Sequence, residues 1–296
     1  MSVVVVTDST AYLPPELTEG YGIHVVPLYV ILPGRSGREG LDVGPEDVAR
    51  ALAVRGQTVS TSRPTPGDFL TAYRQALDAG AERLVSIHLS AELSGTSDAA
   101  RLAASQVGEH IVTVVDSRSA AMGCGFAVLA AARTAAAGGD AGEVAEMARR
   151  TAARTSTFFV VDTLEHLRRG GRIGGAAAVL GSALAVKPVL HVQDGRVVPL
   201  EKVRTTARAN HRLVQRAVEA AGDGPVSVAV HHLDAADRAD RLAAELRERL
   251  PALRELHVSE LGAAIGAHVG PGAVGVVVAP FWEEPGEDVP RDPADG

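Results

Sequence analysis

Three apolar runs, each ending in polar residues, mark the first half of the chain. They read SVVVVTDST at 2–10, LVSIHLS at 84–90 and IVTVVDSRS at 111–119. Continuous runs of β-branched residues are typical of strands that are buried on both faces of a parallel sheet. We therefore predict three buried strands, each of which leads into a polar loop at its carboxyl end.

Helical patterns lie between these runs. Apolar residues recur every three or four positions from 69 to 77, and the alanine-rich segments at 97–106 and 126–137 are good helix formers. Strands that alternate with helices predict a parallel, Rossmann-like α/β sheet, in which ligands bind at the carboxyl ends of the strands. Asp8 and Ser9, at the end of the first run, occupy such a position.

The pattern changes in two places. Residues 22–43 read as extended chain with a hairpin, which predicts a small β excursion from the sheet. After residue 157, strands, a hairpin turn that begins at Asp194, and helices near 204–221 and 234–249 follow one another. This second order of elements is typical of an α+β domain.

We accordingly predict two domains and a tail. The N-terminal α/β domain covers 1–157, with 22–43 as its β excursion, and the C-terminal α+β domain covers 158–282. Residues 283–296 contain six carboxylates and three prolines without an apolar period, so we expect a disordered acidic tail.

The composition narrows the class of ligand. A formal net charge of −7 and an aromatic content of 3% argue against nucleic-acid binding, which favours basic surfaces and stacking rings. No apolar run reaches the roughly 18 residues of a membrane span, so we expect a cytoplasmic protein without stable membrane insertion. The single cysteine, Cys124, excludes an intramolecular disulfide and a multi-cysteine metal site.

The stretch GAHVGPGAVG at 266–275 contains a formal G-x-G-x-x-G. A dinucleotide fingerprint needs a strand before its glycines and a helix after them. Here a helix or turn at 260–267 precedes the glycines, an apolar strand follows them, and Pro271 lacks the N–H that a phosphate loop would use. We interpret the glycines as a sharp turn that presents His268 to a ligand; the alternative is a histidine that is satisfied by local backbone.

Two clusters of hydroxyl side chains come before predicted helices. Ser94 and Gly95 lie between a strand and a helix, and Thr61 and Ser62 lie in a proline-stiffened loop. Each cluster could either cap its helix or hold a ligand. Together with His268 they form a donor set that suits a carboxylate, and the sequence indicates no metal site and no cofactor.

Basic residues gather in two other segments. LEHLRRGGRIGG contains Arg172, and LEKVRTTAR contains Lys202 and Arg204. A solvated surface is the simplest interpretation. Glycines around the arginines disfavour a helix, however, and a positive patch on an acidic protein also suits phosphate or an acidic partner.

Taken together and in order, these segments resemble the DegV family. The resemblance runs from residue 3 to about 280 and rests on seven motifs: VTDSTAYLP, TSRPTPGDF, LSAELSGTSDAA, VVDSRSAAMGCGF, LEHLRRGGRIGG, KPVLHVQDGRVVPLEKVRT and GAHVGPGAVGV. It implies a two-domain α/β protein that buries one long-chain fatty acid between its domains. It also implies a partner, a separate ATP-binding fatty acid kinase subunit that phosphorylates the bound carboxylate. The product, an acyl phosphate, enters phospholipid synthesis, and the chain itself is a lipid-binding carrier and not an enzyme.

The resemblance assigns roles to particular residues. Thr61, Ser94 and His268 hold the carboxylate, and Ser62 and Gly95 assist them.

A second group of residues belongs to the partner. Arg172 and Arg204, with the nearby Lys202, are directed toward the kinase subunit or the transferred phosphate. The chain departs from the family pattern at Arg63, where glutamine is usual, and at Thr65, where serine is usual, so Arg63 adds a charge near the head group.

A serine hydrolase that uses Ser94 and His268 is the alternative from another class. Against it, the sequence has no G-x-S-x-G elbow, and no acid is evidently placed to orient the imidazole.

Overall fold

The N-terminal half is built on a parallel sheet. The computed structural model describes residues 2–179 and 187–282, so the predicted acidic tail lies outside the described residues. The sheet has the order β2-β1-β6-β7, and its four strands are parallel neighbours. Their bounds are β1 Val3–Asp8, β2 His24–Val26, β6 Arg83–His88 and β7 Val112–Asp116.

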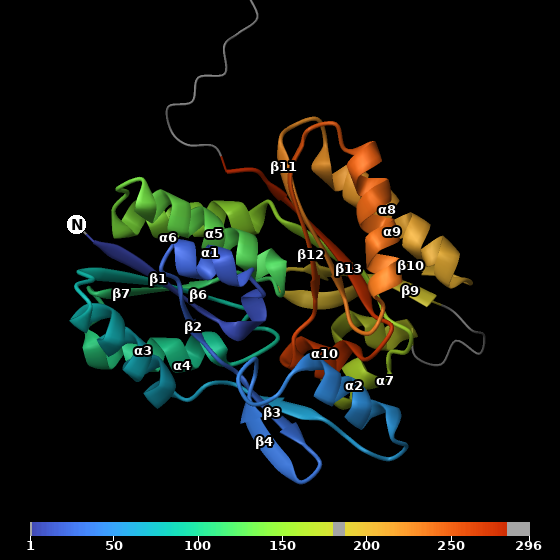
Figure 1. The fold of residues 1–296 in the computed structure, drawn as a ribbon, viewed down its shortest axis with the longest axis horizontal. Helices are drawn as coiled ribbons and strands as arrows, with labels where there is room; N and C mark the ends of the chain where they lie inside the picture. The colour runs from blue at the N-terminus through green and yellow to red at the C-terminus, as the bar shows by residue number, and fades with distance from the viewer. Residues whose placement is uncertain (1, 180–186, 283–296) are drawn as a thin grey trace, which may run out of the picture.

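Helices cover both faces of this sheet, as its β-branched strands require (Figure 1). Val5 packs toward α5 and α6, whereas its neighbour Val6 packs toward α3 and α4, because successive strand residues point to opposite faces. The helices run α3 Pro66–Asp78, α4 Thr96–Val107, α5 Met122–Ala136 and α6 Ala141–Ala153. Cys124 is buried in α5, against the sheet.

Residues 22–43 divide between two sheets. His24–Val26 does not leave the parallel sheet, as the excursion predicted, but forms its edge strand β2. The predicted hairpin forms from β3 Tyr29–Leu32 and β4 Arg35–Arg38, and β5 Ser60–Ser62 pairs with β3 on the other side. Helices α1 Pro15–Gly20 and α2 Pro45–Ala53 flank this region.

The C-terminal half contains a mixed sheet in the order β10-β9-β8-β13-β11-β12. β11 and β12 are parallel, and the other pairs are antiparallel. The strands are β8 Ser156–Val160, β9 Lys187–Gln193, β10 Arg196–Val203, β11 Val226–His232, β12 Leu253–Glu260 and β13 Val274–Pro280. Two amphipathic helices, α8 Thr206–Ala221 and α9 Ala236–Arg249, bury their apolar stripes on one face of this sheet. The predicted two-part α/β architecture is confirmed.

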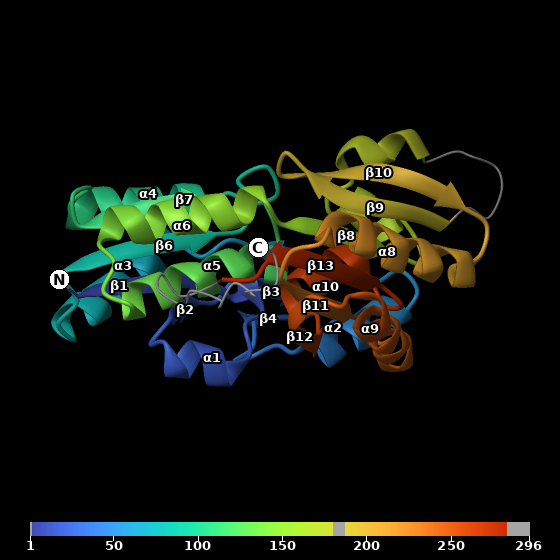
Figure 2. The same cartoon turned by 90° about the horizontal axis from the view of Figure 1, so that it is seen from above.

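Short elements lie where the two halves meet. They are the 3₁₀ segments η1 Ser9–Ala11 and η2 Gly174–Val179, and the helices α7 Glu165–Arg169 and α10 Ala263–Val269. Figure 2 shows the two layered halves side by side, with α10 in the C-terminal half near the small β3-β4-β5 sheet. Within the described residues, no helix combines the length and the apolar character that a membrane crossing requires.

Candidate functional site

A cavity lies between the two halves of the molecule. It holds about 1000 Å³ of empty space, counting the space at its open mouth. Ligand pockets for small molecules are mostly apolar, with a few polar groups that orient the ligand. The lining here is mainly aliphatic and aromatic and comes from both sheets; it includes Leu89, Leu93, Phe159, Val192, Ile265 and Val277.

Five polar side chains gather at one part of this lining, namely those of Thr61, Arg63, Ser94, Arg172 and His268. They come from β5 and the segment after it, the β6–α4 loop, the segment after α7, and α10. The remaining polar lining groups are satisfied within the protein. His231, for example, accepts from the Met122 N–H at 3.2 Å, and the Thr10 hydroxyl donates to Asp8.

The contact between Thr61 and His268 joins the two halves directly. Thr61 Oγ1 lies 2.9 Å from His268 Nε2, although the two residues are separated by 207 positions in the sequence. Gly170 makes room for the ring, because a Cβ on Gly170 would lie 2.1 Å from His268 Nδ1. Among the described residues, Nδ1 is buried without a hydrogen-bond partner. The imidazole is therefore fixed at one nitrogen by Thr61 and by packing on Gly170 at the other.

The His268 ring is neutral at physiological pH. Burial and, secondarily, the Arg172 charge lower the pKa of His268 from its usual 6.5 to about 4. A neutral imidazole carries one N–H, and on Nε2 this N–H donates to Thr61 Oγ1, which leaves the Thr61 hydroxyl hydrogen available to an anion.

This shift predicts a pH-dependent stability. Between the folded pKa of about 4 and the unfolded pKa of about 6.5, the unfolded chain binds more protons at His268, so stability falls as the pH drops through this window. In wild type stripped of lipid, the free energy of unfolding should fall between roughly pH 6.5 and 5. Urea unfolding should show that this fall is about 1 kcal/mol smaller in His268→Gln. The exposed His211 on α8 provides the control variant His211→Gln. An identical pH slope in wild type and His268→Gln would contradict the neutral, buried state of this ring.

Two side chains from the N-terminal half hold the helix that carries His268. Helix α10 begins after Gly262, which has no side chain to cap it. Glu39 accepts from the Ala264 N–H at 2.7 Å, and the Tyr12 hydroxyl accepts from the Ile265 N–H at 3.1 Å. Since unpaired N–H groups at a helix start need acceptors, Glu39 and Tyr12 fix the position of α10. Burial raises the pKa of the Glu39 carboxyl.

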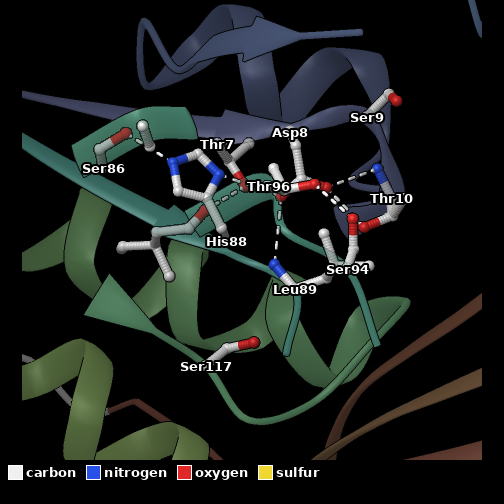
Figure 3. A network of polar contacts seen from close by, with 12 residues as sticks. Thr7, Asp8, Ser9, Thr10, Ser86, His88, Leu89, Ser94, Thr96 and Ser117 are labelled. Carbon is white, nitrogen blue, oxygen red and sulfur yellow. Dashed lines mark hydrogen bonds and ion pairs between the residues drawn. The ribbon is translucent and has the colours of Figure 1, made fainter. Parts of the chain in front are cut away.

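A buried carboxylate organises the neighbouring wall of the cavity. Asp8 Oδ2 accepts from His88 Nδ1 at 3.0 Å and from the Leu89 N–H at 3.1 Å, and Asp8 Oδ1 accepts from the N–H and hydroxyl of Thr10 (Figure 3). Asp8 and His88 have no exposed side-chain surface. Because Thr10 and Leu89 both line the cavity, Asp8 sets the position of this wall from behind.

The same network continues away from the cavity. His88 Nε2 lies 2.7 Å from Ser86 Oγ, and the Tyr73 hydroxyl donates to Ser86 Oγ at 2.8 Å. Asp8, His88 and Ser86 thus follow the order of a catalytic triad, but all three are fully buried, so Ser86 cannot reach a substrate. The network is structural.

Residues 2–280 match the model of the DegV family, which is described as a family of uncharacterised proteins. The chain belongs to the DegV family. A DegV domain-containing protein of Streptomyces coelicolor is 54% identical over 277 residues, covering 94% of this chain and 98% of the relative. The resemblance carried by the seven motifs is confirmed.

Solved structures show the same fold. A fatty-acid-binding DegV family protein of Thermus thermophilus is 36% identical with a TM-score of 0.89, and the match covers 95% of this chain and 100% of that one. DegV of Bacillus subtilis, a fatty acid binding protein, is 33% identical with a TM-score of 0.86, with 95% and 100% covered.

The DegV-family motifs differ in where they place their hydroxyls. Thr61 is not in a loop, as the sequence indicated, but in the short strand β5, opposite Val30. Ser62 in the same strand is exposed, and its hydroxyl turns to the Arg63 carbonyl, so it does not line the cavity. Thr65 caps α3 through a capping box with Asp68. In this hydroxyl cluster the helix is therefore capped by Thr65 and not by Thr61 or Ser62.

Ser94 is not a helix cap. Gly95 occupies the N-cap position of α4, whereas Ser94 Oγ lies 2.8 Å from Thr96 Oγ1 and lines the cavity. His268 contacts Thr61, and no hydrogen bond joins it to Ser94 within the described part of the chain. This geometry does not favour a serine hydrolase that uses Ser94 and His268.

The three predicted basic residues are not brought together. Arg172 is half-buried and donates to the carbonyls of Leu93 at 2.9 Å and Gly170 at 2.6 Å. Lys202 and Arg204 are exposed at the far end of β10, and neither lines the cavity. Val197 does line it, and Lys202 lies five positions further, or roughly 16 Å along a strand.

An outer groove shares a wall with the cavity of this DegV-family chain. Thr61, Arg172 and His268 line both, and His166 and Arg169 contribute to the groove alone. The groove therefore reaches the polar end of the cavity from outside. Neither the groove nor the roles of Gly170, Glu39 and Tyr12 followed from sequence, because each depends on contacts between distant segments.

Proposed function

We propose that the chain binds one long-chain fatty acid, with the acyl tail in the cavity and the carboxylate at Thr61, Ser94 and His268. The observation that carries the proposal is the cavity itself, a mainly apolar space that ends in hydroxyl, imidazole and guanidinium donors and to which no carboxylate of residues 2–179 or 187–282 contributes. Fatty acid binding by the Thermus thermophilus and Bacillus subtilis proteins supports it.

The energetics are adequate. Burying an acyl chain of about 16 carbons at about 0.8 kcal/mol per CH₂ corresponds to roughly 11–13 kcal/mol before any cost is subtracted. Lost translational and rotational freedom removes much of this, but a net affinity typical of a carrier remains. Head-group donors then fix the orientation of the ligand.

The carrier acts, on this proposal, with a second protein in the cytoplasm. A separate ATP-binding kinase subunit phosphorylates the carboxylate, and the acyl phosphate goes to phospholipid synthesis. The outer groove supports this step, since it gives access to Thr61, Arg172 and His268 from outside the cavity. Arg172 would meet the transferred phosphate, whereas Lys202 and Arg204 could contact only a partner that extends over β10.

The direct test is the lipid content of the purified protein. Solvent extraction and mass spectrometry should find about one fatty acid per chain, or uptake of added palmitate or oleate by stripped protein. His268→Ala should weaken palmitate binding by about tenfold or more, because Thr61 would lose the partner that directs its hydroxyl hydrogen to the carboxylate. His211→Ala is the matched control on an exposed helix surface. If the purified protein contained no fatty acid and the stripped protein took up none, the proposal would be refuted.

The kinase step has its own readout. With an ATP-binding fatty acid kinase subunit added, Arg172→Glu should lower the rate of acyl phosphate formation even at palmitate concentrations that saturate the variant. An unchanged rate would remove Arg172 from the phosphate-transfer role and leave the lipid-binding proposal intact.

A further inference from the structure

The polar end of the cavity contains more positive charge than a carboxylate needs. Arg63 and Arg172 both line it, and in the part of the chain that the structure describes no aspartate or glutamate does. Among the described residues, neither guanidinium forms an ion pair with a carboxylate, although many of the other arginines do. Two uncompensated guanidinium groups at one end of a cavity in a protein of net charge −7 indicate a ligand with high negative charge density.

The neutral donors alone can hold a carboxylate. When His268 Nε2–H donates to Thr61 Oγ1 and Thr96 donates to Ser94 Oγ, the Thr61 and Ser94 hydroxyls remain as two donors for two carboxylate oxygens. Arg172 adds a positive charge that is held in place by two backbone carbonyls. A single negative charge is therefore balanced without Arg63.

Arg63 is placed between the two hydroxyl-bearing segments. It follows β5, which carries Thr61, and its Nη1 donates to the Gly95 carbonyl at 3.3 Å, next to Ser94. The side chain lies so closely over Gly95 that an added Cβ there would be 2.0 Å from Arg63 Nη1. One N–H group is used in this contact, so most of the guanidinium donors are available to a ligand.

We propose that Arg63 is a specificity-determining residue that makes this site prefer a single-chain lipid with a dianionic phosphate head group over the free fatty acid. The inference rests on the proposed function and deepens it, since the acyl phosphate product is such a lipid. A phosphate presents three acceptor oxygens and a second negative charge, and a planar guanidinium matches two of those oxygens at once. Arg63 would then retain the phosphorylated product after transfer.

The expected effect is moderate because Arg63 is exposed. Water and salt screen an exposed charge, so its removal should weaken binding of the dianion by about tenfold and binding of the monoanion by at most about twofold. The diagnostic quantity is the ratio of the two affinities, because a structural defect would change both affinities alike.

The test compares palmitate with hexadecyl phosphate, which carries close to two charges at about pH 8. Dissociation constants are measured by isothermal titration on stripped wild type, Arg63→Gln, Arg63→Lys and Arg74→Gln. Arg74 lies exposed on α3 and provides a control with the same change in net charge. We expect Arg63→Gln to lower the preference for hexadecyl phosphate by about tenfold, Arg63→Lys to restore it in part, and Arg74→Gln to leave it unchanged. The preference should also shrink with added salt.

The outcomes separate the two proposals. If wild type bound palmitate and showed the same ratio of the two affinities as Arg63→Gln, the role of Arg63 would be overturned and the fatty acid proposal would stand. If Arg74→Gln lost the preference for hexadecyl phosphate to the same extent, net charge alone would explain the effect, and the role of Arg63 would again be overturned. Wild-type protein that binds neither lipid would refute the proposed function itself.

Discussion

Replacing Gly170 with alanine is expected to weaken palmitate binding by about tenfold to a hundredfold, the energy of one or two charge-assisted hydrogen bonds. The new Cβ would lie 2.1 Å from His268 Nδ1, and the next nearest atom is also in that ring. The imidazole must therefore move, and with it the contact between His268 Nε2 and Thr61 Oγ1. Isothermal titration of stripped protein with palmitate measures the effect.

A second glycine provides the control. A Cβ on Gly224 would meet no atom within 4 Å, and this glycine does not require a positive φ, so Gly224→Ala should leave the affinity unchanged. Unfolding of Gly170→Ala in urea shows whether the fold survives. Palmitate affinity equal to wild type in a folded Gly170→Ala would mean that His268 is not held where the head group binds.

Replacing Asp8 with asparagine should lower the free energy of unfolding by about 2–4 kcal/mol, a large effect for an isosteric change. Each Asp8 oxygen accepts two hydrogen bonds, from Thr10 on one side and from His88 and Leu89 on the other. An amide has one acceptor oxygen, so its NH₂ group would face donors on one side without water to separate them. Urea unfolding followed by circular dichroism measures the loss.

The exposed Asp78 at the end of α3 serves as the comparison, and Asp78→Asn should change stability by less than about 0.5 kcal/mol. Palmitate affinity should also fall in Asp8→Asn, because Thr10 and Leu89 line the cavity. If Asp8→Asn were as stable as wild type, the network in Figure 3 would not be what fixes the ends of β1 and β6.

Sequence periodicity predicted the elements whose surroundings are uniform. The runs that became β1, β6 and β7 are apolar on both faces because helices cover both faces, and this alone distinguishes them from half-exposed strands. The hairpin at Asp194 followed from local turn chemistry, and both Asp194 and Gly195 have the positive φ that such a turn requires.

Elements with mixed surroundings were missed. β12 is an edge strand with partly exposed residues, and its sequence LRELHVSE alternates too weakly to stand out from a loop. β5 has three residues, so its pairing with β3 cannot be read from any period. Helices α1, α2 and α6 also escaped the periodicity, although the proline that begins each of the first two is a local signal for a helix start.

The site shows the same division. Thr61, Ser94 and His268 were identified through motifs, and the structure places all three around one cavity, where their role in binding remains a prediction. The residues that position them could not be found in this way. Glu39 accepts a hydrogen bond from the Ala264 N–H, although it lies 225 positions earlier in the chain. Gly170 makes room for the His268 ring, although the two residues belong to different elements. Only the folded chain creates these contacts.

The place of β13 in its sheet has a consequence for the order in which the protein can be assembled during synthesis. β13 pairs with β8 on one side and β11 on the other, so until it emerges from the ribosome the C-terminal sheet consists of two unconnected pieces. Helix α10, with His268, directly precedes β13. The N-terminal sheet depends on nearer neighbours and can form while the chain is still being made. A nascent chain would therefore complete its first sheet well before it could hold a lipid.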